Sequence, residues 1–255
     1  MQMHRLHFLP YPEVYLAIFL LVLGVLFIIL QLRLVAYAYE RLGLTRRGAM
    51  AVLFGSLLGS GINIPVAELP SRTMIAPGVV DYFGMQYVVP MVMQQDSTII
   101  AVNVGGAIIP VLVTLLLMAR YGFSRRAFAV LAFATILVHL LAQPVPGVGI
   151  AMPPFLPPIV IAVAALLIDP SAAPRTAFIS GTLGTLIGAD LLNLGRIRDL
   201  GAPVASIGGA GTFDGIFLVG ILAVLLTTVP MLGHRIRGKL GLKPHPQEPP
   251  ISRAA

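Results

Sequence analysis

Two aspartates in the last third of the chain have the residue type and the surroundings that chemistry inside a membrane would need. Asp190 lies within an apolar segment, and Asp214 follows the glycine-rich run 207–211. We expect them on consecutive helices of a hairpin, at a similar height. Two close carboxylates repel each other and can share a proton, whereas the amides of a helix N-terminus favour an ionised Asp214 or a bound anion. The sequence leaves these alternatives open.

Other amide and carboxylate side chains fall near the same ends of the apolar segments. Asn193 has i, i+3 spacing from Asp190 and therefore shares its helix face. Because polar groups are costly in lipid, each needs a partner or a cavity. We expect one outward-facing ligand-binding site formed by Asn63, Glu68, Asn103, Asp190, Asn193 and Asp214. Asp190 and Asp214 are catalytic candidates only if the protein is a hydrolase.

A structural interpretation of these residues also stays open. Asp214 would then cap a helix, Asp190 would pair with an arginine of the segment that follows it, and Asn63 and Asn103 would only satisfy breaks in helices. A lone histidine in an apolar segment usually bonds a carbonyl, and we expect this of His139.

The composition predicts that a lipid bilayer surrounds these residues. The 255 residues are 57% hydrophobic and 11% charged, with a mean hydropathy of +0.93, whereas soluble domains are about 25% charged. The net charge of +7 is attributed to basic residues at span ends rather than to nucleic-acid binding. Cysteine is absent, which excludes disulfides and thiolate metal sites. No Walker, His-Glu-x-x-His or dinucleotide motif is present, so we expect neither a metal nor a cofactor.

The apolar segments predict an all-α polytopic membrane protein with about seven transmembrane helices, some broken by Gly or Pro. A spanning helix needs roughly 20 residues, so residues 1–233 would form a single transmembrane domain, and residues 234–255 a disordered cytoplasmic tail. The predicted spans are Tyr15–Leu32, Ala49–Leu69, Gly105–Met118, Ala127–Leu141, Ile159–Ile168, Ala177–Leu194 and Phe213–Leu232.

The stretch 79–104 is the one sizeable non-helical candidate and predicts a β-hairpin on the outer face. Met85–Val89 and Ser97–Val102 are rich in β-branched residues and flank the polar turn Gln94-Gln95-Asp96, a pattern typical of a hairpin. Pro90 would limit the first strand to an edge. A re-entrant segment is the alternative.

Basic residues predict the orientation. Most Lys and Arg fall in the connections after the first, third and fifth spans and in the tail, so that side is predicted to be cytoplasmic. The N-terminus would lie outside and the C-terminus inside, in the plasma (inner) membrane.

Four motifs resemble an uncharacterised prokaryotic membrane family, domain of unknown function 1614. They are Asn63-Ile64-Pro65-Val66, Asn103 to Pro110, Gly188 to Leu194, and Ser206 to Phe217. This resemblance implies a bacterial or archaeal membrane protein and brings no established activity. A weaker similarity is to intramembrane aspartyl proteases, which place one aspartate on a span and a second in a Gly-x-Gly-Asp motif. Here Thr212 and Phe213 separate Gly211 from Asp214.

Three functions follow as hypotheses. A small transporter or ligand-binding membrane protein agrees with interrupted helices that line a cavity, with a small solute or ion as its partner. An intramembrane aspartyl-type protease is the first alternative, and a structural or assembly factor is the second. The sequence identifies neither the substrate, the coupling ion nor the oligomeric state.

Overall fold

The computed structural model is mostly helical and describes residues 13–70, 72–82, 85–95, 97–145, 149–197, 203–209 and 214–239. Its α-helices are α1 (Glu13–Arg41), α2 (Arg46–Gly59), α3 (Ile109–Tyr121), α4 (Arg125–Leu141), α5 (Leu156–Ile168), α6 (Ala173–Thr185), α7 (Leu194–Ile197) and α8 (Gly215–Lys239). Two π-helical segments, η1 (Val104–Ile108) and η2 (Leu186–Asp190), adjoin α3 and α6, and the short 3₁₀ helix η3 (Leu191–Asn193) follows η2.

Capping side chains and prolines fix where several helices begin. The hydroxyl of Thr45 accepts a hydrogen bond from the Gly48 amide at 3.2 Å, and that of Ser124 from the Ala127 amide at 3.0 Å. Such caps satisfy amides that have no partner within the helix. The helices α3, α5 and α6 instead carry a proline in their first turn, where its missing N–H costs nothing.

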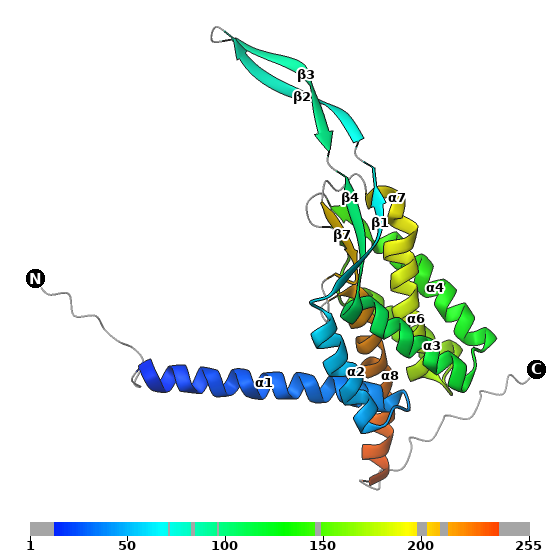
Figure 1. Ribbon diagram of the computed structural model, residues 1–255. Coiled ribbons are helices and arrows are strands. Elements are labelled where there is room, and N and C mark those ends of the chain that lie inside the picture. Colours follow the sequence, from blue (N-terminus) through cyan, green and yellow to red (C-terminus); the bar gives the residue numbers. More distant parts are fainter. Residues whose placement is uncertain are drawn as a thin grey trace, which may run out of the picture.

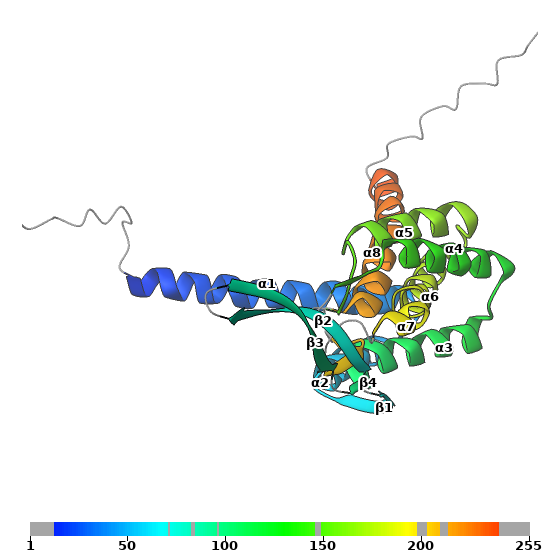
Figure 2. The same ribbon diagram turned by 90° about the horizontal axis from the view of Figure 1, so that it is seen from above.

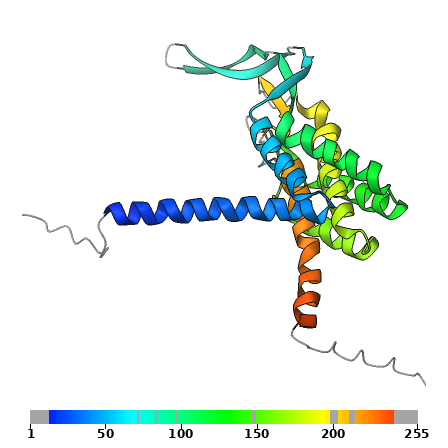
Figure 3. The same ribbon diagram turned by 60° about the horizontal axis from the view of Figure 1, so that its bottom comes forward.

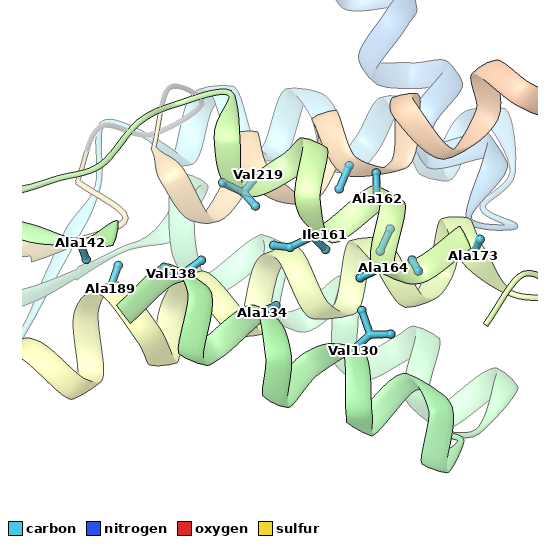
Figure 4. Close-up of a cluster of buried hydrophobic side chains, with 13 residues drawn as sticks. Val130, Ala134, Val138, Ala142, Ile161, Ala162, Ala164, Ala173, Ala189 and Val219 are labelled. Atoms are coloured by element: carbon cyan, nitrogen blue, oxygen red, sulfur yellow. The ribbon is translucent and has the colours of Figure 1, made fainter. Parts of the chain in front are cut away.

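Small side chains form the core where α4, α5, α6 and α8 meet (Figure 4). Val130, Ala134 and Val138 of α4 face Ile161 and Ala162 of α5, and Ala189 and Val219 extend the same cluster. Glycines then allow the backbones to approach closely, as small residues do between membrane helices. A Cβ built on Gly181 of α6 would lie 3.0 Å from the Cα of Gly220 on α8.

Three helical segments of the described chain are long and apolar enough to cross a membrane. They are Val14–Arg41, Val104–Tyr121 and Ala173–Arg196, and two shorter apolar helices cover Leu156–Ile168 and Gly215–Thr228. The expectation of about seven transmembrane helices is therefore not confirmed. The first, third and sixth predicted spans fall within the three long segments, whereas the fifth and seventh fall on the shorter helices.

The predicted second span, Ala49–Leu69, is wrong. The helix α2 ends at Gly59, and residues Asn63–Leu69 form strand β1. The Ser60 amide still bonds to the Ser56 carbonyl, but the chain then turns away at Gly61. The cause is tertiary. The backbone of β1 pairs with strand β4 (Thr98–Asn103), whereas a helix through this segment would lose a hydrogen bond at Pro65.

A β-hairpin is present, but its pairing differs from the expectation. The strands β2 (Arg72–Tyr82) and β3 (Met85–Gln95) pair with each other, and β1 pairs with β4 from Asn63↔Asn103 to Leu69↔Thr98. The two pairings continue one long antiparallel ribbon (Figure 1). The polar residues Gln94 and Gln95 are therefore paired residues at the end of β3, opposite Thr73 and Arg72, and not a turn. Asp96 lies outside the described residues. Pro90 is opposite Pro77.

Short strands connect the ribbon to the bundle. Strand β7 (Val204–Ile207) pairs in parallel with β4, which gives a sheet of order β1-β4-β7. A separate pair, β5 (Gln143–Val145) and β6 (Gly149–Ala151), lies between α4 and α5. Ile100, Ala107, Ile207 and Ile216 form a small apolar cluster that attaches the sheet to η1 and to the start of α8.

Helix α1 leaves the bundle crosswise to α8, and the views in Figures 1, 2 and 3 agree on this. Only its C-terminal end is packed, where Ala38, Tyr39 and Leu42 join a buried cluster with α3, α6 and α8. Between Val14 and Leu34 its apolar side chains are almost all exposed.

Candidate functional site

One group of candidate residues lies at the base of the ribbon. Asn63 and Asn103 are opposite each other in the β1–β4 register. The Asn103 Nδ2 donates to Asn63 Oδ1 at 3.0 Å and to the Ser60 carbonyl at 2.8 Å, and Ser206 Oγ donates to Asn63 Oδ1 at 2.6 Å. The side chains thus join β1, β4 and β7 with the end of α2.

Asn103 also fixes the start of η1. Its Oδ1 accepts the Gly106 amide at 2.8 Å, and the side chain is fully buried. Gly105 must be glycine because a Cβ there would collide with the Ser56 carbonyl and the Ser60 amide. Every polar atom of the Asn103 amide is therefore occupied by the chain itself, which is the arrangement that the structural interpretation of this residue expects.

A second group forms where α4 passes η2 and η3. His139 Nδ1 lies 3.1 Å from the Gly188 carbonyl, the contact expected of a lone histidine. Asn193 is 1% exposed. Its Nδ2 donates to the Ala189 carbonyl at 2.9 Å and to the Gly188 carbonyl at 3.2 Å. These bonds satisfy carbonyls that the π and 3₁₀ turns release from regular helical pairing.

Asp190 and Asp214 lie within electrostatic range of each other. Asp190 ends η2, and Asp214 immediately precedes α8. Asp214 acts as a helix cap: its Oδ1 accepts the Ile216 amide at 2.8 Å, and its carbonyl accepts the Leu218 amide at 2.8 Å. Both carboxylates are partly buried. Two like charges at such a site favour a shared proton or a bound cation.

Hydroxyl groups line the contact between α6 and α8 below the two aspartates. A Cβ built on Gly215 would lie 3.4 Å from Thr185 Cγ2, so Thr185 lies against Gly215. A Cβ built on Gly220 would lie 2.5 Å from Thr182 Oγ1, so Thr182 lies against Gly220. The hydroxyl oxygens of Thr182 and Thr185 are buried, and neither has a hydrogen-bond partner within the described chain. We call Asp190, Asp214, Thr185 and Thr182 the α6–α8 seam.

A small pocket opens beside Asp214. It has a volume of about 270 Å³, and its lining is Ile150, Ala151, Met152, Pro154, Asp214, Gly215, Leu218 and Val219. Strand β6 and the segment that follows it thus cover one side of the helix start, and Asp214 supplies the charged group. This volume suits an ion with some water or a small solute rather than a peptide.

Glu68 and Asn63 lie apart from the seam. Both are exposed on the edge strand β1, where Glu68 is opposite Ile99. The six candidates thus fall into the Asn63–Asn103 pair, Asn193 beside His139, the Asp190–Asp214 pair and an exposed Glu68. The apolar cluster of Ile100, Ala107, Ile207 and Ile216 connects β4, which carries Asn103, with the start of α8, which follows Asp214.

Sequence reasoning did not assign Ser60, Ser206, Thr182 or Thr185 to the site. Serine and threonine are common in membrane helices and bond their own backbone, as Thr114 does with the Pro110 carbonyl at 2.9 Å. Their positions in the sequence do not distinguish Thr182 and Thr185, whose hydroxyls are unpaired in the described residues, from Thr114, whose hydroxyl bonds to the backbone. In the described residues, no group of three or more His, Cys, Asp and Glu side chains could hold a metal ion.

Comparisons with known proteins place the chain in a family. Searches of curated proteins and of solved structures found no match, so they give no support for a similarity to intramembrane aspartyl proteases. The model of a family described as protein of unknown function (DUF1614) matches residues 57–226, a range that includes all six candidate residues and most of the bundle but not α1. The chain therefore belongs to the DUF1614 family.

Proposed function

We propose that this chain is a small multi-pass transporter or solute-binding protein of the plasma membrane, and that it binds a small cation or a cationic solute at the α6–α8 seam. The observation that carries the proposal is the position of the two aspartates. Asp190 ends η2, Asp214 immediately precedes α8 and lines a pocket of about 270 Å³, and α6 and α8 pack closely between them where Thr185 meets Gly215. A cation between the two carboxylates, or a proton shared by them, would remove their repulsion.

The seam can offer a hard cation one further ligand, the hydroxyl of Thr185. Carboxylate, hydroxyl and carbonyl oxygens bind such ions, and this buried hydroxyl, five residues before Asp190, has no hydrogen-bond partner in the described residues. Thr182 lies one turn further from Asp190. Broken helices line the binding sites of many transporters. The π segment η2 and the non-helical stretch before α8 are breaks of this kind.

The proposed orientation puts the sheet and ribbon outside the cell. The connections α1–α2, α3–α4 and α5–α6 share one end of the bundle and carry Arg46, Arg125 and Arg175 among other arginines. By the positive-inside rule this end is cytoplasmic. The seam then lies toward the outer side, the C-terminus lies inside, and we place the N-terminus outside.

The cysteine-free sequence makes this orientation testable with single cysteines. Ser124→Cys, in the α3–α4 connection, should resist a membrane-impermeant maleimide added to intact cells and react after lysis. Glu68→Cys, on the exposed edge of β1, should react in intact cells. The reverse labelling pattern would contradict the proposed orientation.

Ion flux in proteoliposomes tests the function directly. Protein reconstituted with an internal pH-sensitive dye would be given a gradient of Na⁺ or K⁺, and the rate of dye response measured. We expect Asp190→Asn and Asp214→Asn to reduce the rate at least tenfold. Glu68→Gln is the matched control, since it removes an exposed carboxylate away from the seam and should keep the rate. Elution as a single peak in size-exclusion chromatography would show that each variant is folded.

Two other functions are separate outcomes of this experiment. Paired aspartates are also what an aspartyl-type membrane hydrolase uses, because a shared proton lets the pair activate water. If that is the function, the wild-type protein will cleave a transmembrane peptide and show no ion flux. Either Asn variant will then abolish the cleavage. If both variants behave like the wild-type protein in flux and in cleavage, the aspartates are structural, and the proposed binding site is wrong.

A further inference from the structure

A pocket at the opposite end of the bundle from the seam collects positive charge. It has a volume of about 240 Å³ and lies among the end of α1, the end of α3 and the start of α6. Its lining contains the guanidinium groups of Arg41 and Arg175 and the ring of Tyr121, and no Asp or Glu side chain. A concave surface with two arginines and no carboxylate favours an anion.

Both arginines are held in place by tyrosines. The Arg175 guanidinium lies 4.2 Å from the centroid of the Tyr121 ring, and Arg41 Nε donates to Tyr37 Oη at 2.8 Å. Stacking leaves the edge of the Arg175 guanidinium available for hydrogen bonds. Arg41 donates from both Nε and Nη2 to Tyr37 Oη and can still donate from Nη1. Gly43 has a φ of 93°, and a Cβ at that position would collide with the Tyr121 hydroxyl. The turn after α1 is thus shaped around the Tyr121 ring.

Two acidic side chains at this end of the bundle, Asp169 and Glu40, do not line the pocket. Asp169 is 4% exposed and accepts Thr176 Oγ1 at 2.6 Å and Ser171 Oγ at 3.3 Å. It therefore ties the end of α5 to the start of α6. Glu40 lines a different pocket, with Arg33 and Arg46.

We propose that this pocket binds the phosphate of an anionic phospholipid through Arg41 and Arg175. A phospholipid, rather than free phosphate, fits the surroundings because exposed apolar side chains of α1 continue from Arg41 along the same helix face. Leu34 and Leu30 precede Arg41 by seven and eleven positions, a spacing that keeps them on one face of a helix. They are 41% and 54% exposed and offer a surface for an acyl chain. Basic pockets between membrane helices on the cytoplasmic side are where anionic headgroups bind. The ligand would tie α1, α3 and α6 together.

Lipid titration tests the site without knowledge of the transported solute. The purified full-length chain in a non-ionic detergent would be titrated with phosphatidylglycerol, phosphatidylcholine or inorganic phosphate, and the melting temperature followed. We expect phosphatidylglycerol to raise it and the other two to leave it nearly unchanged. Arg175→Gln and Arg41→Gln should each weaken the apparent phosphatidylglycerol affinity about tenfold or more, because each removes a charge-assisted hydrogen-bond donor.

Arg126→Gln is the matched control. It removes the same charge from the same end of the bundle, but Arg126 is exposed and does not line the pocket. The apparent phosphatidylglycerol affinity of this variant should stay within about twofold of the wild-type value. If Arg126→Gln weakens binding as much as Arg175→Gln, the effect is diffuse surface charge and the site is wrong. A response to inorganic phosphate equal to that for the lipid, or equal responses to both lipids, would also overturn the proposal. Asp190→Asn should not change lipid affinity, which separates this site from the seam.

Discussion

Helix α1 and the segment Ala173–Arg196 are both long and apolar enough to cross a membrane, yet they are packed in opposite ways. The most hydrophobic 18-residue window has a hydropathy of 2.8 in α1 and 1.3 in Ala173–Arg196, but none of the first window is buried in the protein, against 61% of the second. The more hydrophobic helix is thus the one that the protein does not cover.

Side-chain size explains this inverse relation. Between Val14 and Leu34, α1 consists mostly of large aliphatic and aromatic residues, whereas α6 carries Gly181, Gly184 and several small hydroxyl residues. Lipid is as apolar as leucine, so large side chains gain nothing from contact with another helix, while small ones allow close backbone packing. A central, moderately polar helix and a peripheral, strongly apolar arm are the result.

The largest effect is expected from a charge in the middle of α1, which tests whether this helix lies in lipid. We expect Leu23→Arg to cost about 3 kcal/mol of insertion free energy, the usual penalty for arginine at the centre of a spanning helix. The fraction of protein in the membrane pellet after expression measures this. Leu23 is 51% exposed, so Leu23→Ala should leave that fraction unchanged. Equal membrane fractions for the arginine and alanine variants would show that α1 is not in hydrocarbon.

A pair of glycine substitutions sharpens the contrast at an intermediate magnitude. A Cβ on Gly188 would lie 2.5 Å from the Thr135 carbonyl oxygen and 3.0 Å from the His139 amide, whereas one on Gly24 meets nothing within 4 Å. Gly188→Ala should therefore destabilise the bundle by about 2 kcal/mol, as overpacking does. Gly24→Ala should be neutral or stabilise by up to about 1 kcal/mol. Thermal unfolding in detergent compares them, and equal shifts would contradict the packing described.

Removing a buried amide should have a smaller effect. Asn193→Ala leaves the Ala189 and Gly188 carbonyls without their side-chain donor, and we expect a loss of about 1–2 kcal/mol. Gln31→Ala is the control on α1, where the side chain is exposed, and its effect should be within about 0.5 kcal/mol. Chemical denaturation measures both. A larger loss for the Gln31 variant would mean that α1 has a polar partner.

The smallest expected effect separates packing from ligand binding. Thr182→Val replaces a buried hydroxyl that has no partner in the described residues with a methyl group, so stability should be unchanged or rise by less than about 1 kcal/mol. Thr227→Val removes a hydroxyl that donates to the Val224 carbonyl at 2.7 Å and should be slightly destabilising. If Thr182→Val destabilises more than Thr227→Val, the Thr182 hydroxyl has a structural partner, and its place in the seam is wrong.

Several features were predictable from the sequence because they follow from local chemistry. The long apolar runs predicted α1 and α3, and the resemblance of the Asn103 and Asp190 segments to DUF1614 is confirmed by the family match. The His139 contact with a carbonyl was also expected. In each case the residues themselves carry the information, through hydrophobicity or through a fixed order of side chains.

Other features depended on partners far along the chain. Asn63–Leu69 became a strand because β4 lies beside it. The pairing of β2 with β3 continues the register of Leu69↔Thr98, which brings Tyr82 opposite Met85. Likewise, only the packing of α8 against Thr182 and Thr185 shows that their hydroxyls are buried without a hydrogen-bond partner in the described residues.

The sequence by itself determined that this chain needs an apolar environment and that a few acidic and amide groups must be accommodated within it, because composition alone sets the cost of those groups in lipid. Tertiary structure decided which of those groups meet. Asn103 is occupied by the chain's own backbone, whereas Asp190 lies near a second carboxylate. The physical reason is that a hydrogen bond or a repulsion exists only between atoms within a few ångströms, and folding rather than sequence spacing sets those distances.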